Sequence, residues 1–315
     1  MLIAEGEIMR VSVIMTTFNG ENYIVTQLNS LLGQTRQADE VLIYDDGSED
    51  HTVEIIRKFI NTNNLINWKL IINQVNKGWR RNFFDGICEA NGDIVFPCDQ
   101  DDMWMAEKIE IMENIMASNE KIDLLVSNYR IQNSTGDKIC PNANDKEIKL
   151  ILQSDNIFSV PYPGCTFCIR KELIANSQKY WKESFPHDAF FWRCALIKGS
   201  LFCVNQDLIM WRIHNDSTFS AEKLENKSIE KKIEWLKYGE DTLNALYAYL
   251  VEIDNKYQKS GKKILDRNLQ WINLRKDLFQ KKKIIAWIKL RKYMNIYPQK
   301  KQYIFDLFYL LKSII

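Results

Sequence analysis

The chain has 315 residues, of which 46% are hydrophobic and 26% charged, enough for one large domain or for one domain with an extension. Its formal net charge of +1 argues against a globally basic nucleic-acid-binding protein. Seven irregularly spaced cysteines, with one C-x-x-C at Cys165 and Cys168, and only three histidines argue against a zinc site and favour free thiols in a reducing cytosol.

The N-terminal segment "MLIAEGEIMR" contains Glu5 and Glu7 and lacks the long apolar stretch of a signal peptide. No stretch of the sequence approaches the uninterrupted apolar length of a membrane-spanning helix. We therefore expect a cytoplasmic protein.

The first half of the sequence alternates between strand and helix patterns. The apolar, β-branched run "VSVIMTT" is typical of a strand buried on both faces. Further strands are predicted at 40–46, 68–74, 92–102 and 121–131, and helices at 23–35, 48–60 and 80–90. Gly33 is a stop signal for the first helix, and Ser48 is the expected N-cap of the second. This alternation predicts β-α-β units and a mainly parallel sheet in an α/β fold.

The pattern changes twice in the second half. Pro161, Pro163 and Gly164 interrupt residues 140–220, where we expect short strands and loops over the first half. After about residue 225 the chain is predicted to be helical and becomes increasingly basic. We therefore expect one domain at 1–222 and a helical extension at 223–315.

Two acidic clusters follow predicted strands. Asp45 and Asp46 end the second strand, and Asp99, Asp101 and Asp102 follow the fourth. Ligands of parallel α/β sheets bind beyond the carboxyl ends of the strands. Closely spaced carboxylates there suit a hard divalent cation that bridges to substrate phosphates. The competing interpretation is a solvated acidic turn in which Asp102 caps the next helix.

Four segments resemble, in order, the motifs of family 2 inverting glycosyltransferases: "VSVIMTTFNGENYIVTQLNSLLGQT", "DEVLIYDDGSEDHT", "NKGWRRNFFDGICEANGDIVFPCDQDDMW" and "PHDAFFW". The resemblance covers about residues 9–220 and is greatest for the rhamnosyltransferase-like branch of bacterial surface-polysaccharide synthesis. It implies a GT-A type fold with a donor half at about 9–125 and an acceptor half at about 126–222.

The resemblance also implies roles for individual residues. It implies that Asp99 and Asp101 hold Mn²⁺ or Mg²⁺ on the sugar nucleotide, and that Asp188 is the catalytic base. A carboxylate can take the proton from an attacking hydroxyl, although Asp188 could equally be a helix N-cap. The donor-binding residues that it implies are Thr17, Asn19, Glu21, Asp45, Asp46, Asn76, Lys77, Gly78, Arg81 and Asp99.

A further group is expected near the acceptor or the phosphates: Asp102, Trp104, Gly164, Cys165, Thr166, His187 and Arg212. His214 is a candidate metal or phosphate ligand, with an exposed edge strand as the alternative for both it and Arg212. One departure from the branch concerns Ala189 and Phe190, which stand where two tryptophans are common. That departure leaves the acceptor undefined.

Residues 281–315 contain nine Lys or Arg and one Asp, interleaved with aromatic residues. Basic amphipathic segments of this kind bind anionic membrane surfaces. The alternative is a helical extension that packs on the catalytic half or on a second subunit of a homodimer. No recognisable nucleic-acid-binding module accompanies the basic residues.

The sequence thus predicts a metal-dependent inverting glycosyltransferase. The donor would be dTDP-rhamnose or a UDP-hexose, and the acceptor a hydroxyl of a glycan, lipid-linked at the inner face of the membrane. A phosphatase would need its nucleophilic aspartate after the first strand, and a pyrophosphorylase a glycine-rich loop there, but the chain has "TTFNG". The non-enzymatic alternative is a degenerate GT-A-like scaffold associated with the membrane.

Overall fold

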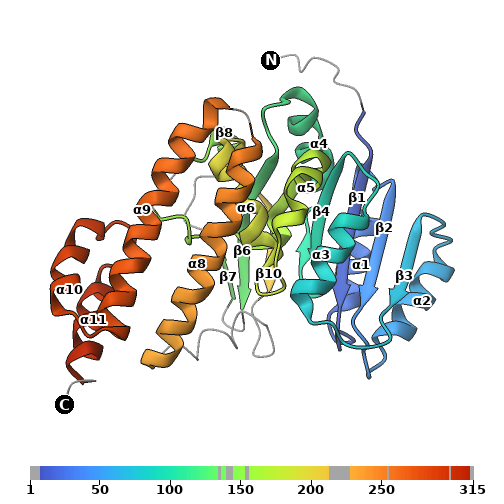
Figure 1. The fold of residues 1–315 in the computed structure, drawn as a ribbon. Helices are drawn as coiled ribbons and strands as arrows, with labels where there is room; N and C mark the ends of the chain where they lie inside the picture. The colour runs from blue at the N-terminus through green and yellow to red at the C-terminus, as the bar shows by residue number, and fades with distance from the viewer. Residues whose placement is uncertain are drawn as a thin grey trace. The chain divides into compact units, whose positions relative to one another are not determined.

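The computed structural model describes residues 8–133, 136–139, 145–152, 156–212, 228–253, 255–297 and 299–312. The chain divides into two compact units (Figure 1). The first consists of Met1–Ile151, Tyr162–Ala195 and Ser200–His214, and the second of Leu152–Pro161, Leu196–Gly199 and Asn215–Ile315.

A mixed sheet forms the centre of the first unit, in the order β3-β2-β1-β4-β9-β6-β10-β5. Its strands are β1 (Val11–Thr17), β2 (Glu40–Asp45), β3 (Trp68–Ile72), β4 (Ile94–Asp99), β5 (Met103–Trp104), β6 (Leu124–Asn133), β9 (Phe167–Arg170) and β10 (Leu201–Arg212). Two short strands, β7 (Gly136–Ile139) and β8 (Ile148–Leu150), pair with β6 and β10. The neighbours β3, β2, β1 and β4 are all parallel, as are β6 and β10. Antiparallel β9 joins the two groups.

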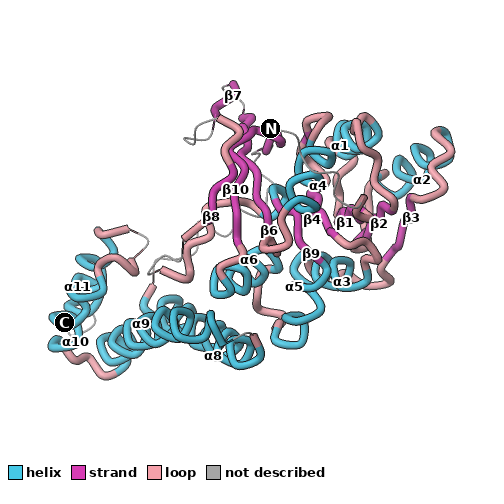
Figure 2. The backbone as a smooth tube through the Cα atoms, turned by 90° about the horizontal axis from the view of Figure 1, so that it is seen from above, coloured by secondary structure: helices cyan, strands magenta, loops and turns pink. Residues whose placement is uncertain are grey.

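Helices cover both faces of this sheet (Figure 2). One face carries α1 (Ile24–Leu32), α2 (Thr52–Thr62) and α4 (Lys108–Ser118), and the other α3 (Trp79–Glu89), α5 (Lys171–Ser177) and α6 (His187–Lys198). All seven residues of β1 are buried, as its apolar pattern predicts. The α/β fold with its central parallel strands is therefore confirmed.

Two helix boundaries test the local predictions. Gly33 is the C-cap of α1, as expected. Ser48 is not the N-cap of α2, because that helix begins at Thr52 after His51 and has no side-chain cap. The hydroxyl of Ser48 instead donates to Asp45 and accepts from the backbone N–H of Asn19. It therefore connects the loops after β1 and β2.

The second unit is helical, as predicted. It contains α8 (Ile229–Glu252), α9 (Asn255–Gln280), α10 (Ile284–Leu290) and α11 (Lys301–Lys312). The proposed boundary at 222 lies outside the described residues. Within the described part of the chain, no helix combines the length and apolarity that a membrane crossing requires. The six described cysteines, Cys165 and Cys168 among them, are free thiols.

Candidate active site

The candidate site lies where the carboxyl ends of β1, β2, β3 and β4 meet. Their register places Thr17 beside Asp45 and Asp99 beside Thr16. The loops that follow these four strands therefore meet at one edge of the sheet. Most of the predicted donor-binding residues lie in these loops.

Asp45 fixes the loop that follows β2. Its fully buried carboxylate accepts hydrogen bonds from the hydroxyls of Thr17 (2.7 Å) and Ser48 (2.6 Å), and from the backbone N–H groups of Gly47 (3.2 Å) and Ser48 (2.8 Å). The neighbouring loop is held in the same way, since the backbone N–H of His51 donates to Glu21 (3.0 Å). Asp45 and Glu21 thus stabilise the loops after β1 and β2. Their roles in donor binding stay predictions.

Asp46 holds the segment between β3 and α3. Its carboxylate accepts from the backbone N–H groups of Lys77 and Gly78 and from the side-chain amide of Asn73, each at 2.8 Å. Gly78 has a φ of 80°, which a residue with a side chain rarely adopts. The carboxylate of Asp46 is thus bonded within the chain, and its role in donor binding stays a prediction.

A pocket of about 590 Å³ opens beside this segment. Ligand pockets commonly have such a volume. Its lining contains four of the predicted donor-binding residues, which are Asn76, Lys77, Gly78 and Arg81. Both cations are paired with Asp85, at 3.3 Å from the Lys77 Nζ and 2.7 Å from the Arg81 Nε. Arg81 also pairs with Glu183 (3.2 Å), so both cations already have carboxylate partners and their roles in donor binding stay predictions.

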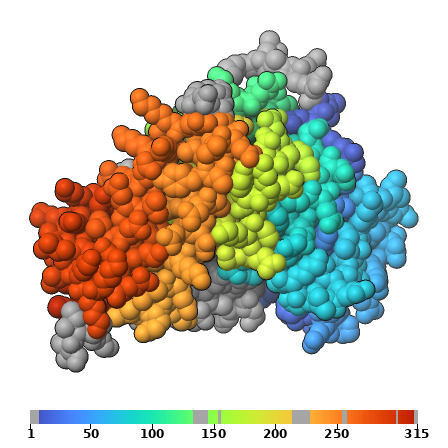
Figure 3. All heavy atoms as spheres, viewed as in Figure 1, coloured from blue at the N-terminus to red at the C-terminus, as the bar shows by residue number. Residues whose placement is uncertain are grey.

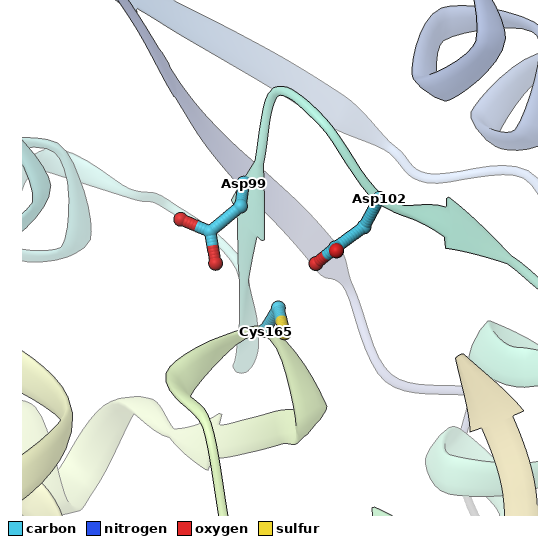
Figure 4. A group of neighbouring side chains, drawn as sticks. All are labelled: Asp99, Asp102 and Cys165. Atoms are coloured by element: carbon cyan, nitrogen blue, oxygen red, sulfur yellow. The ribbon is translucent and has the colours of Figure 1, made fainter. Parts of the chain in front are cut away.

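Three potential ligand groups converge at the end of β4 (Figure 4). The carboxylates of Asp99 and Asp102 and the thiol of Cys165 lie within 4.8 Å of one another. Asp102 is buried, and one carboxylate oxygen accepts from the backbone N–H of Arg212 (3.0 Å). The other oxygen has no hydrogen-bond partner among the described residues. This orphaned oxygen could bind a cation.

The electrostatics of this group follow from its burial. Burial raises the pKa of Asp99 above its ordinary value, and the charges of Asp102, Asp101 and Asp188 raise it further. Burial and the charge of Asp101 raise the pKa of Asp102 to about 7. Ionisation of all these carboxyls together is therefore unfavourable at neutral pH, and a divalent cation would favour their charged forms.

Asp188 lies close to this group, in the first turn of α6. It is half-buried, and its charge contributes to the raised pKa of Asp99. Its Oδ1 accepts from the N–H of Ala189 (2.6 Å). A Cβ added to Gly164 would lie 3.0 Å from both the Asp188 Cβ and the His187 Nε2. The short 3-10 helix η1 (Gly164–Thr166) therefore packs directly against the predicted base.

His187 is buried beneath the predicted base. Its ring stacks on Phe83 with 4.2 Å between centroids and meets Trp79 edge-on. Neither ring nitrogen has a hydrogen-bond partner among the described residues. Burial lowers the pKa of His187 to about 4, so the imidazole is neutral at pH 7.

Two residues of the site were missed by sequence reasoning. Lys108 is fully buried, and its Nζ donates to the carbonyl oxygen of Cys165 at 3.1 Å. Burial lowers the pKa of Lys108 to about 8. Gln100 exchanges two hydrogen bonds of 3.0 Å with the backbone of Phe18 and so ties the acidic turn to the loop after β1. The signal for Lys108 was a lysine at the start of α4 among apolar residues.

The remaining predicted residues are dispersed around the acidic group. Trp104 is 3% exposed and lies in the hydrophobic core, 4.5 Å from the Lys108 Nζ. The Arg212 guanidinium lies over the ring of Tyr23. Asp101 is half-buried in the turn after β4 and is not one of the three converging groups. His214 lies outside the described residues. The site roles of all four stay predictions.

Comparisons with known proteins agree with this geometry. Residues 12–192 match the family model described as Glycosyl transferase family 2. The dTDP-rhamnosyl transferase RfbG of Shigella flexneri is 29% identical over 66% of this chain and 74% of its own. The UDP-Glc:alpha-D-GlcNAc-diphosphoundecaprenol beta-1,3-glucosyltransferase WfgD of Escherichia coli is 27% identical over 75% of this chain and 88% of its own.

Solved structures share the fold. A structure of residues 1–349 of S. aureus TarS with UDP-GlcNAc superposes with a TM-score of 0.62 and 21% identity. The match covers 86% of this chain and 73% of that one. The chain spans 43% of a longer TarS chain.

Proposed function

The chain belongs to glycosyl transferase family 2, and on that premise we propose that it transfers a sugar, with inversion, from a nucleoside diphosphate sugar to a hydroxyl of a glycan. Members of the family act on nucleotide sugars, so the enzyme class is established and the donor, acceptor and metal are the proposal. The observation that carries it is the convergence of Asp99 and Asp102 at the carboxyl end of β4, with Asp188 of α6 close enough for its charge to raise the pKa of Asp99.

We assign the transfer step to Asp188. Its carboxylate takes the proton of the acceptor hydroxyl while that oxygen attacks the anomeric carbon. The bond from the anomeric carbon to the diphosphate oxygen breaks, and the nucleoside diphosphate leaves with the electron pair. Attack opposite the leaving group inverts the configuration. Asp188 is half-buried beside η1, so its carboxylate is accessible to the acceptor hydroxyl while part of it is shielded from solvent.

The carboxylates of the turn after β4 fit a divalent cation. The unpartnered oxygen of Asp102 and the raised pKa of Asp99 are the features that a cation would compensate. We propose Asp99 and Asp101, the pair that the family resemblance implies, as the ligands of Mn²⁺ or Mg²⁺, and Asp102 adds negative charge beside them. Hard cations prefer oxygen ligands, so the Cys165 thiol is not assigned as one. When bound, the cation would neutralise charge on the departing diphosphate.

The donor and acceptor are proposed from the relatives. RfbG is named for dTDP-rhamnose and WfgD for UDP-glucose and a diphosphoundecaprenol acceptor. We therefore propose dTDP-rhamnose or a UDP-hexose as donor and a lipid-linked glycan as acceptor. Such an acceptor would bring the enzyme to the cytoplasmic face of a membrane.

A panel of nucleotide sugars tests this proposal. We expect one of dTDP-rhamnose, UDP-glucose, UDP-galactose or UDP-GlcNAc to raise the thermal unfolding midpoint, and Mn²⁺ to increase that shift. Slow hydrolysis of the same donor should release the nucleoside diphosphate. Failure of every donor, with and without metal, would contradict the proposal and favour a catalytically degenerate scaffold.

A further inference from the structure

Helices α10 and α11 expose a concentration of large apolar side chains. Seven of them are between 46% and 65% exposed to solvent: Ile284, Ile285, Ile288, Ile304, Phe305, Phe308 and Leu311. The four on α11 follow the spacing i, i+1, i+4, i+7, which places them on one side of the helix. Figure 3 shows the red C-terminal helices at the surface of the second unit.

The other sides of the two helices are packed. Ala286 and Leu290 of α10 are buried, and so is Leu310 of α11. The ring of Trp287 stacks on Tyr303 with 4.7 Å between centroids, and its Nε1 donates to the Tyr303 carbonyl oxygen at 2.9 Å. The helices are thus held together by their own contacts. The exposed apolar residues therefore form an outward face.

Exposed basic side chains flank these residues along the chain. The exposed cations are Lys281, Lys282, Lys283, Lys289, Arg291, Lys292, Lys300 and Lys301. The single acidic residue of the segment 281–315 is Asp306. It is fully buried and bonded to Arg275 at 2.8 Å and to Lys232 at 3.2 Å, so it does not offset the surface charge. Asp277, just before the segment, pairs with Lys281 (2.7 Å) and Lys283 (4.0 Å).

We propose that the exposed faces of α10 and α11 bind the anionic surface of a lipid bilayer. Apolar side chains framed by Lys and Arg match a layer of negative headgroups over hydrocarbon. A second copy of the chain fits less well, because a symmetric contact would bring two surfaces with the same excess of cations together. The proposal rests on the proposed function in that it locates, on α10 and α11, the membrane contact which that function implies. Vesicle binding is measured without a sugar donor, so its failure is distinguishable from a failure of the proposed function.

Sedimentation of the full chain with vesicles tests the proposal. We expect binding to phosphatidylcholine vesicles that contain phosphatidylglycerol, little binding to pure phosphatidylcholine, and weaker binding at high salt. The double substitution Phe305→Ser with Phe308→Ser should reduce the partition coefficient by about tenfold or more. Lys289→Gln with Lys300→Gln should reduce it on the anionic vesicles alone.

A matched control is Ile66→Ser, which removes an apolar side chain that is 95% exposed in the first unit and should leave binding unchanged. Circular dichroism and the unfolding midpoint establish that each variant is folded. Absence of vesicle binding by the unaltered protein, or equal binding by the Phe305/Phe308 variant, would overturn the proposal. So would a dimer of the unaltered protein that this variant dissociates, since the surface would then belong to a second copy.

Discussion

At the scale of single residues, the acidic turn after β4 offers two arrangements of metal ligands. The family resemblance pairs Asp99 with Asp101, whereas the structure brings Asp99 together with Asp102 and Cys165. An extended D-x-D would point both carboxylates the same way, but residues 100–102 turn. The sequence identified the cluster, because acids after a buried strand are distinctive. It could not identify which pair converges, because that depends on the turn.

Substitutions in this turn separate the two arrangements. We expect Asp101→Asn to raise the Mn²⁺ concentration needed for half-maximal activity by about tenfold or more, since a charged ligand is lost. Asp102→Asn should raise it by less than about threefold, since the amide oxygen can still accept from the Arg212 N–H. Manganese titrations of donor turnover measure both. The reverse order would assign the metal to Asp99, Asp102 and Cys165.

His187 gives a pH-dependent contribution to stability. Its pKa is about 4 in the folded protein and near 6.5 otherwise, so below pH 6.5 the unfolded chain binds a proton that the folded chain excludes. Stability should therefore fall as the pH decreases from 7 to 5, by about 2 kcal/mol from this residue. His187→Phe should remove that difference. The free energy of unfolding in urea, measured at pH 7 and pH 5, tests this prediction. The same pH dependence in His187→Phe as in the unaltered protein would contradict it.

At the scale of elements, periodicity predicted the strands and helices around the site well. The buried run of β1 and the Gly33 stop needed only local information. Ser48 was assigned wrongly because its hydroxyl bonds to the preceding Asp45 of β2 and to the backbone of Asn19 in the loop after β1. Lys108 and Gln100 were missed for the same reason. Local sequence thus indicates which elements form, whereas contacts between loops decide how polar side chains are used.

The packing of η1 against α6 predicts an effect of one methyl group. A Cβ at residue 164 would require Asp188 or His187 to move by a few tenths of an ångström. We expect Gly164→Ala to lower kcat by about tenfold with donor affinity within about twofold, because catalysis is sensitive to the position of the base. Gly33→Ala, at the C-cap of α1, is a control for the loss of a glycine. An unchanged kcat in Gly164→Ala would show that the packing of η1 against Asp188 does not affect catalysis.

At the scale of the whole molecule, each unit has its own core, and the core of the second unit contains charge. Asp306 is fully buried between Arg275 and Lys232 and also accepts from the Tyr297 hydroxyl at 2.9 Å. The sequence predicted helices here and a basic surface. The sequence did not indicate the buried pair of Arg275 and Asp306, because these residues lie 31 positions apart in the chain.

Removing the buried acid should destabilise the second unit. We expect Asp306→Ala to lower its free energy of unfolding by about 3–5 kcal/mol, because Arg275 would remain buried without its partner. The exposed pair of Asp277 with Lys281 provides the control, and Asp277→Ala should leave the free energy of unfolding nearly unchanged. Hydrogen exchange of the α9 backbone amides measures both. Equal protection in the two variants would show that the buried pair is not needed.

The central claim is that Asp188 takes the acceptor proton in a transfer from a nucleotide sugar. The most direct measurement compares Asp188→Asn with the unaltered enzyme in donor dissociation constant and in transfer rate. We expect donor affinity within about threefold and a kcat lower by about a thousandfold, while Glu120→Gln, an exposed acid on the surface, changes neither. A transfer rate of Asp188→Asn near that of the unaltered enzyme would contradict the account.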